Sequence, residues 1–416
     1  RDLHTAYRRQ RQMCIRDSGS STGIARPAQR HRTVRQGAMM PARSVFRDDH
    51  ELFREQVRRF VADEILPHYA TWERDGITPR ALWKRAGDAG LLNCTLPPPF
   101  GAGGDFGHAA IVIEELARAS CLGIGFSIHS DMVSSYIHRY GNDAQRERWL
   151  PSMAAGERIG AIAMTEPGTG SDLKAIRTRA RPDGDHYILS GQKTFITNGA
   201  NAGLVVVLAS TEPDLGARGL SLFCVEEGLP GFSKGPVLEK IGQHAQDTCE
   251  LFFDDVVLPA DCLLGELNQG FSHVANELTQ ERLCIALRAG ASIEALLDET
   301  VAYTRERKTF GRRVFDYQNT RFQLADARSQ SRMLRVFLDD CLARHMDGEL
   351  DEVDAAIAKL NATEMHGRLL DALLQLHGGY GYMSEYAIGR AWVDARAMRI
   401  YGGSSEIMRE IIARSL

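Results

Sequence analysis

The stretch IRTRARPDGDHYILSGQKTFITNG, residues 176–199, decides the fold of this 416-residue chain. It holds short runs rich in β-branched and aromatic residues, separated by Pro182-Asp183-Gly184 and closed by Asn198-Gly199. Turn residues between such runs are typical of antiparallel strands. Similar runs follow downstream, so a small barrel or sandwich is expected, with strands at 176–180, 186–190, 193–197, 204–208, 220–225 and 249–253.

Helical patterns flank this β-rich segment on both sides. Asp48-Asp49 is expected to cap a first helix, and Pro79 to open a shorter one. Proline is absent from residues 271–416, as long helices require. Helices are expected there at about 271–307, 318–346, 352–376 and 403–414. The sequence therefore predicts an α+β multidomain protein, with a helical domain at 45–160, a β domain at 161–270 and a second helical domain at 271–416.

Composition argues against several kinds of partner. Fifty Lys and Arg against 54 Asp and Glu leave a net charge of −4, which gives no reason to expect nucleic acid or an anionic membrane. No apolar run approaches the roughly 18 residues that span a bilayer. The eight cysteines form no C-x-x-C pair, so no metal site is expected. They are expected to be buried, in a protein of a reducing compartment.

The first 38 residues differ from the rest of the chain. They hold nine arginines against Asp2 and Asp17, and they show neither helical nor strand periodicity. The favoured interpretation of residues 1–44 is a disordered or spurious extension ahead of a start at Met39 or Met40, which would leave a cytoplasmic bacterial protein. A transit peptide for the mitochondrial matrix is the alternative. A DNA-binding arm is a third interpretation.

Two stretches of the β-rich segment carry groups suited to a flat ligand. AMTEPGTGSD, residues 163–172, runs from a strand into a turn whose glycines let a ring approach and whose N–H and hydroxyl groups can bind its edge. KTFITNG, residues 193–199, alternates like a strand, so Phe195 can stack on a ring and Thr197 can hydrogen-bond a ring nitrogen. An ordinary turn and a core strand are the structural alternatives. Glu166 and Asp172 are expected to organise the turn and neighbouring helix ends.

Three stretches of the C-terminal segment suit anions or carbonyl groups. RERKTFGRR, residues 305–313, clusters arginines at a helix end, where they can grip a pyrophosphate. QLHGGYGY, residues 375–382, and YGGSSE, residues 401–406, are glycine-rich breaks between helices. A glycine turn that opens a helix suits a bound anion or carbonyl. Each stretch alone is also explained by a helix end or an interhelical turn.

Together, in this order and on a helix–strand–helix frame, the five stretches resemble the acyl-CoA dehydrogenase family. Residues 163–172 and 375–394 match its two signature motifs, and the resemblance covers about residues 45–416. It implies an N-terminal helical domain, a central β-barrel and a C-terminal four-helix bundle. It also implies FAD between barrel and bundle, in a homotetramer or homodimer where a neighbouring subunit completes the site. The implied activity is α,β-dehydrogenation of an acyl-CoA thioester to the trans-2-enoyl-CoA, with an electron-transferring flavoprotein as acceptor.

The resemblance assigns roles residue by residue. The flavin ring would be met by Met164, Thr165, Ser171, Phe195 and Thr197, with Thr197 near N5. Contacts to the ADP half, largely across a subunit interface, would come from Arg307, Thr309, Phe310, Gln318, Gln375, Gly378 and Gly379. Ser404 and Glu406 fall at further FAD positions, and Glu406 replaces a common Gln. The substrate would be bound by Ser171, Arg282, Gly402 and Gly403, with the Gly402 N–H on the thioester carbonyl.

The catalytic base is expected at Glu281. This residue shares one helical stripe with Val274, Leu278 and Ile285, and a carboxylate on an apolar stripe is costly unless it is paired or used. Pairing with Arg282 or Arg288 is the structural alternative. Many family members carry the base where this chain has Gly402, whereas Glu281-Arg282 matches the relocated base of isovaleryl-CoA and long-chain acyl-CoA dehydrogenases. The absence of Glu at 402 and its presence at 281 therefore explain each other.

The substrate class follows the same resemblance. Residues 280–283 and 400–409 are similar to the long-chain branch, so a medium-chain, long-chain or branched acyl-CoA is expected. One alternative is a flavin oxidase or monooxygenase of the same fold. Another is a non-enzymatic DNA-binding relative of the alkylation-response kind. The last would need a basic surface in the folded body, whereas the excess of arginine lies in residues 1–38.

Overall fold

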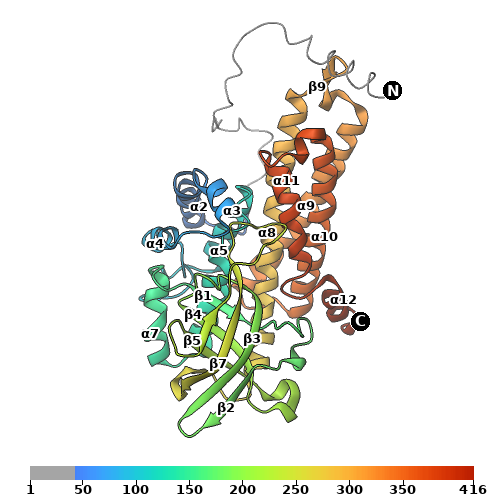
Figure 1. Ribbon diagram of the computed structural model, residues 1–416. Coiled ribbons are helices and arrows are strands. Elements are labelled where there is room, and N and C mark those ends of the chain that lie inside the picture. Colours follow the sequence, from blue (N-terminus) through green and yellow to red (C-terminus); the bar gives the residue numbers. More distant parts are fainter. Residues whose placement is uncertain (1–42) are drawn as a thin grey trace, which may run out of the picture. The chain divides into compact units, whose positions relative to one another are not determined.

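Helices, a β-sheet and helices again follow one another along residues 43–416, the part of the chain that the computed structural model describes (Figure 1). The expectations for the arginine-rich N-terminus lie outside the described residues. The change to strands comes at Gly160 and the return to helices at Gly270. No helix of the described part is long and apolar enough to cross a membrane.

The N-terminal helices begin with α2, Asp48–Phe60, which continues as a π-helix over Val61–Ile65. Its cap differs from the prediction: Arg47 is the N-cap residue, and its N–H donates to His50 Nδ1 at 3.1 Å. Asp48 and Asp49 lie in the first turn, where their negative charge interacts favourably with the positive end of the helix dipole. The other helices are α3 Tyr69–Asp75, α4 Arg80–Asp88, α5 Phe106–Arg118, α6 Ser134–Tyr140 and α7 Asp143–Ala154, and a π-helix over Ile128–Val133 leads into α6.

The β region is one eight-stranded sheet with the order β6-β7-β3-β2-β4-β5-β8, and β1 pairs in parallel with β4. The hairpin expected around Pro182-Asp183-Gly184 is present, because Asp183 pairs with His186. Two expected runs merge into β3, where the register shifts between Lys193 and Ile196. The strands are β1 Gly160–Ala163, β2 Arg179–Asp183, β3 His186–Thr197, β4 Leu204–Ser210, β5 Leu220–Glu226, β6 Phe232–Lys234, β7 Thr248–Pro259 and β8 Leu263–Leu264.

The C-terminal helices match the expected ranges closely. They are α8 Gly270–Glu306, α9 Gln318–Met346, α10 Glu352–His377, α11 Ala387–Ala395 and α12 Ser405–Arg414. The small hairpin of β9 Lys308–Thr309 and β10 Arg312–Arg313 joins α8 to α9. One hydrophobic core runs from α2 and α5 into α8, α9 and α10, so the two helical regions are packed as one body. The described cysteines are all buried and free, as expected.

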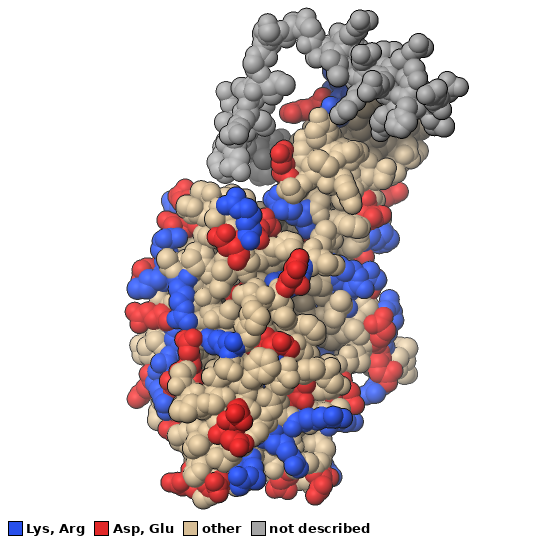
Figure 2. All heavy atoms as spheres, in the orientation of Figure 1, with Lys and Arg blue, Asp and Glu red and all other residues tan. Residues whose placement is uncertain are grey.

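Surface charge is mixed in sign over the described residues. Figure 2 shows acidic and basic side chains interspersed over the visible face. That face therefore offers no continuous basic patch of the kind that binds a phosphate backbone.

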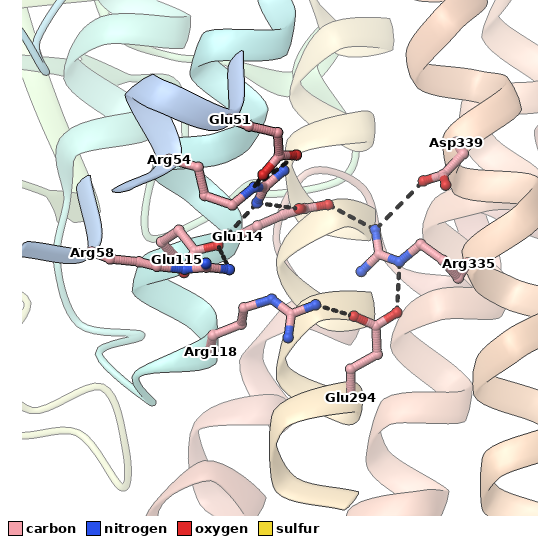
Figure 3. A network of polar contacts seen from close by, with 9 residues as sticks. All are labelled: Glu51, Arg54, Arg58, Glu114, Glu115, Arg118, Glu294, Arg335 and Asp339. Carbon is pink, nitrogen blue, oxygen red and sulfur yellow. Dashed lines mark hydrogen bonds and ion pairs between the residues drawn. The ribbon is translucent and has the colours of Figure 1, made fainter. Parts of the chain in front are cut away.

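A buried ionic network joins the two helical regions (Figure 3). Arg335 of α9 is 1% exposed, and its guanidinium pairs at 2.7 Å with Glu114 of α5 and at 2.7 Å with Glu294 of α8. Arg54 of α2 pairs with Glu114 and with Glu115. Because breaking a buried pair leaves an uncompensated charge, this network fixes how α2, α5, α8 and α9 meet.

Candidate active site

Glu281 lies in the N-terminal third of α8 and is 7% exposed. Tyr136 of α6, itself fully buried, donates its hydroxyl to Glu281 Oε1 at 3.2 Å. Burial raises the pKa of Glu281 to about 7, and the neighbouring Glu277 adds to the rise, while the Tyr136 hydrogen bond and Arg282 oppose it. A carboxyl group with this pKa changes protonation state near neutral pH, as a general base must.

The expected alternative, an ion pair between Glu281 and a neighbouring arginine, is wrong. Arg282 pairs instead with Glu352 of α10, at 3.0 Å. Within residues 43–416 no cationic side chain lies within 4.0 Å of the Glu281 carboxylate. Glu277, one turn earlier, shows the contrast, because it pairs with Arg139 at 2.8 Å and accepts from Tyr140 Oη at 2.9 Å. Glu277 is therefore a structural carboxylate, whereas Glu281 is held by a single phenol.

The turn at Gly402-Gly403 lies against the same helix. A Cβ built on Gly402 would come within 2.5 Å of Ile285 Cδ1, and Ile285 is one turn past Glu281. Both glycines have left-handed backbones, with φ of 65° and 91°. Neither N–H has a hydrogen-bond partner in the described chain. The turn thus offers two free donors next to the Glu281 helix.

The two central stretches meet as adjacent loops. Thr194 N–H donates to the Thr165 carbonyl at 2.9 Å, and Lys193 Nζ donates to the Met164 carbonyl at 2.8 Å. Glu166 accepts from Lys193 and from two backbone N–H groups, so it organises the turn as expected. Asp172 caps the short helix that follows by accepting from the N–H of residue 174 at 3.2 Å. Met164 and Leu278 of α8 pack in one hydrophobic cluster with Tyr136, so these loops adjoin the Glu281 region.

Exposed groups mark the outer side of these loops. Phe195 is 68% exposed and has a left-handed backbone with φ of 59° at the irregularity in β3. Thr197 is half-buried at the end of β3, and Ser171 is exposed. A Cβ on Gly168 or Gly170 would meet nothing within 4 Å. An aromatic ring, hydroxyls and bare backbone together suit the face and edge of a flat ring system.

The third and fourth stretches meet at the opposite end of α8. Arg307, Thr309, Gln375, Gly378 and Gly379 line one open cleft of about 590 Å³, together with Tyr303, Tyr380 and neighbouring side chains. A Cβ on either glycine would meet nothing within 4 Å, so the cleft wall is bare backbone at these two positions. The Arg307 guanidinium lies 5.2 Å from the Tyr380 ring centroid. An arginine, an amide and free backbone suit a phosphate-bearing ligand.

Four assigned residues do not line this cleft. Phe310 stands 98% exposed at the β9–β10 turn, and Gln318 begins α9. Ser404 is the N-cap of α12 and accepts from Ile407 N–H at 3.4 Å. Glu406 is exposed in the first turn of α12. In this chain, Ser404 and Glu406 belong to the Gly402 turn rather than to the cleft.

Sequence reasoning missed three residues of the site. Tyr136 gave no signal, because its contact with Glu281 joins α6 to α8 across 145 residues. Lys193 and Lys359 are both fully buried. Each was visible as a charged residue in an apolar setting: Lys193 in an alternating strand, and Lys359 among Ala355, Ala356, Ala358 and Ala362.

Three family models match the chain in order. They are the N-terminal, middle and C-terminal domains of acyl-CoA dehydrogenase, at residues 47–157, 161–256 and 268–416. The chain belongs to the acyl-CoA dehydrogenase family, a family of flavin-dependent oxidoreductases. The matches confirm the expected helical, β and helical domains and the expected class of enzyme.

Individual relatives span nearly the whole chain. The long-chain specific acyl-CoA dehydrogenase of Sus scrofa mitochondria is 48% identical over 377 residues, covering 90% of this chain and 88% of that protein. The mitochondrial isovaleryl-CoA dehydrogenase of Oryza sativa is 36% identical and covers 89% of this chain and 92% of that protein.

Solved structures agree with the fold. The acyl-CoA dehydrogenase from Geobacillus kaustophilus has a TM-score of 0.87 at 43% identity, covering 89% of this chain and 98% of that one. A glutaryl-CoA dehydrogenase from Mycobacterium smegmatis in complex with FADH2 has a TM-score of 0.84 at 29% identity, covering 89% and 95%.

Proposed function

We propose that this protein catalyses FAD-dependent α,β-dehydrogenation of an acyl-CoA thioester to the trans-2-enoyl-CoA, with Glu281 as the base. The observation that carries the proposal is the buried Glu281 carboxylate, which has a phenol as hydrogen-bond partner and no ion pair within the described chain. A structural carboxylate at such a depth would be paired, as Glu277 is.

Proton abstraction then follows from the surroundings of Glu281. The α C–H of a thioester is weakly acidic, so the carbonyl must be polarised by aimed donors. The free Gly402 N–H supplies one such donor, because its turn packs on Ile285, one turn from the base. The Glu281 carboxylate takes the α-proton, and Tyr136 keeps the carboxyl group oriented through its hydroxyl. The apolar cluster that contains Tyr136, Met164 and Leu278 excludes water from the hydrogen bond between Tyr136 and Glu281.

The residues present fit a flavin dinucleotide. Met164, Thr165, Ser171, Phe195 and Thr197 offer the ring a stacking face and edge donors, since Phe195 is exposed beside bare glycine backbone. When bound, FAD supplies the acceptor for the hydride that leaves the β-carbon. Arg307, Thr309, Gln375, Gly378 and Gly379 would hold the ADP half in their cleft.

The length of α8 indicates that this cleft holds the ADP half of an FAD whose flavin lies in another subunit. Arg307 follows Glu281 by 26 residues along α8, which at about 1.5 Å per residue is roughly 39 Å. One FAD cannot span that distance. We therefore propose a homo-oligomer, tetramer or dimer, in which the cleft and the exposed Phe310 complete the neighbouring subunit's site.

The proposed substrate is a medium-chain, long-chain or branched acyl-CoA, and the proposed acceptor is an electron-transferring flavoprotein. The 48% identity to a long-chain specific enzyme and the 36% identity to an isovaleryl-CoA enzyme support this range. Arg282, Gly402, Gly403 and Ser171 are the proposed substrate contacts. The test is anaerobic titration with acyl-CoAs from about C4 to C18 and branched ones, following loss of flavin absorbance. Bleaching by none of them would contradict the proposal.

Oxygen reactivity separates this function from an oxidase of the same fold. Stopped-flow mixing of the reduced, product-bound enzyme with oxygen should give slow reoxidation. Reoxidation at the turnover rate would instead identify an oxidase.

A further inference from the structure

Two lysines have no solvent exposure, and each clamps the carbonyl of a loop in the candidate site. Lys193 of β3 donates to the Met164 carbonyl and pairs with Glu166 at 2.9 Å. Lys359 of α10 donates to the Gly403 carbonyl. The difference between them is charge compensation: among the residues that the structure describes, no carboxylate lies within 4.0 Å of the Lys359 ammonium.

An unpaired ammonium in the interior is expensive, since its transfer from water costs several kcal/mol. Burial lowers the pKa of Lys359 to about 8, and nearby Arg282 adds to the fall, while Glu406 opposes it. Glu352 pairs with Arg282 and not with Lys359, whose ammonium keeps no ion pair within the described residues. The side chains of Lys359 and Arg282 therefore give the surroundings of the Gly402 turn an excess of positive charge.

The Gly402-Gly403 turn is wedged between two helices. On one side, a Cβ on Gly402 would touch Ile285 of α8, and on another it would lie 3.9 Å from Lys359 Cε. Left-handed glycines are free to rotate, so an anchor is needed to keep their N–H groups in one direction. The Lys359–Gly403 hydrogen bond is that anchor, because no backbone hydrogen bond holds either glycine N–H in the described chain.

We infer that Lys359 is a positioning residue for the dehydrogenation: its ammonium fixes the Gly402-Gly403 turn so that the Gly402 N–H meets the thioester oxygen, and its uncompensated charge favours the negative charge that builds up on that oxygen. The inference rests on the proposed function. Lys359 exchanges no proton or electron in the step. The α C–H bond breaks, its proton forms an O–H bond on Glu281, and the electron density left behind is stabilised beside the turn.

The test is Lys359→Met, which keeps most of the buried chain and removes the charge and the donor. Arg335→Met is the matched control, because Arg335 is an equally buried cation whose partners lie in the interhelical network. The first readout is the rate of flavin reduction by substrate under anaerobic conditions. The second is the absorption maximum of a bound aryl-conjugated 2-enoyl-CoA, which moves to longer wavelength when its thioester carbonyl is polarised. The third, which needs no flavin, is hydrogen exchange of the peptide spanning residues 398–408.

Lys359→Met should slow flavin reduction by about 100-fold, because the unanchored Gly402 N–H no longer points at the thioester oxygen and one aimed donor contributes about that factor. The absorption shift of the bound ligand should shrink, and the 398–408 amides should exchange faster. Arg335→Met should lower thermal stability and leave the reduction rate and the absorption shift unchanged. Wild-type reduction and a wild-type absorption shift in Lys359→Met would overturn the inference.

A second variant covers the case in which Lys359→Met does not fold. Lys359→Gln retains a donor on a side chain one bond shorter and loses the charge, so it should show the same losses to a smaller degree. A wild-type rate and shift in that variant would again overturn the inference. Failure of the proposed function would look different, because then the wild-type enzyme and Arg335→Met would not be bleached by any acyl-CoA either.

Discussion

Gly402 and Ile285 face each other so closely that a Cβ on Gly402 would lie 2.5 Å from Ile285 Cδ1. Ile285 is one helical turn past Glu281, so Gly402 touches the helix that carries the proposed base. Positions 281 and 402 thus both adjoin Ile285, and we expect them to border one space. A side chain at 402 would need Ile285 to give way.

Moving the base back to 402 should therefore depend on Ile285. The double variant Glu281→Thr with Gly402→Glu should be almost inactive. The Cβ added at position 402 clashes with Ile285, and the left-handed φ at that position costs about 1 kcal/mol for a residue other than glycine. Adding Ile285→Val removes Cδ1, and flavin reduction should rise at least about tenfold over the double variant. Equal rates in the double and triple variants, both folded with FAD bound, would contradict a shared space.

Subunit sharing predicts complementation between two inactive variants. Glu281→Gln lacks the base, and Arg307→Glu should fail to hold the ADP half in the cleft. Unfolding and refolding them together with FAD should create sites with an intact Glu281 from one chain and an intact Arg307 from the other. With random pairing, roughly a quarter of the sites should be active. Activity no higher than that of either variant alone would show that the cleft does not serve the neighbouring chain.

The pH dependence of stability should reveal the buried carboxyl group. Its pKa is raised from 4.5 to about 7 in the folded protein, so the folded state binds the proton more tightly than the unfolded one. Unfolding free energy should therefore fall between about pH 4.5 and 7 on account of this group. Glu281→Gln removes the effect, and its stability relative to wild type should improve by roughly 2 kcal/mol from pH 5 to pH 8. Urea unfolding at both pH values measures this, and a constant difference would contradict the raised pKa.

The same pKa predicts the rate profile. Only the carboxylate form of Glu281 accepts a proton, so the rate of flavin reduction should rise through about pH 7 and level off above it. Stopped-flow reduction at saturating substrate is the measurement. A rate that is flat from pH 5 to 9 would exclude Glu281 as the titrating base.

The ionic network should behave as a stability element. Arg335→Met removes one close cation from Glu114 and one from Glu294, and the loss in unfolding free energy should be about 3 kcal/mol. Adding Glu294→Gln should recover part of this loss, because it removes one of the buried carboxylates that Arg335 no longer compensates. Thermal unfolding of wild type, Arg335→Met and the double variant measures the three stabilities. A further, additive loss of stability in the double variant would contradict an energetic coupling between Arg335 and Glu294.

Local patterns were enough to predict the long C-terminal helices and most strands. Apolar periodicity and the absence of proline placed α8, α9 and α10 within about two residues. The missed strands β6 and β8 are short, with three and two residues, so they carry too few positions for a pattern. The missed α11 follows a glycine-rich break and shows how nearby turn signals hide a short helix.

The candidate site likewise contains residues that the sequence could predict and residues that it could not. Glu281 stood out because a carboxylate breaks an apolar stripe, and the structure adds that no ion pair within the described chain compensates it. What sequence could not supply are contacts between distant elements, such as Tyr136 with Glu281 and Lys359 with Gly403. The pairing of Arg282 with Glu352 was likewise hidden, because it joins α8 to α10.

The most direct test of the central claim compares two carboxylates on one helix. Glu281→Gln and Glu277→Gln are mixed anaerobically with the best acyl-CoA, and flavin bleaching is followed in a single turnover. Glu281→Gln should bind FAD and acyl-CoA yet bleach at least about 1,000-fold more slowly than wild type, because it cannot take the α-proton. Glu277→Gln, whose carboxylate is held by Arg139 and Tyr140, should bleach within about tenfold of wild type. Bleaching of Glu281→Gln at the wild-type rate would contradict the assignment of Glu281 as the base.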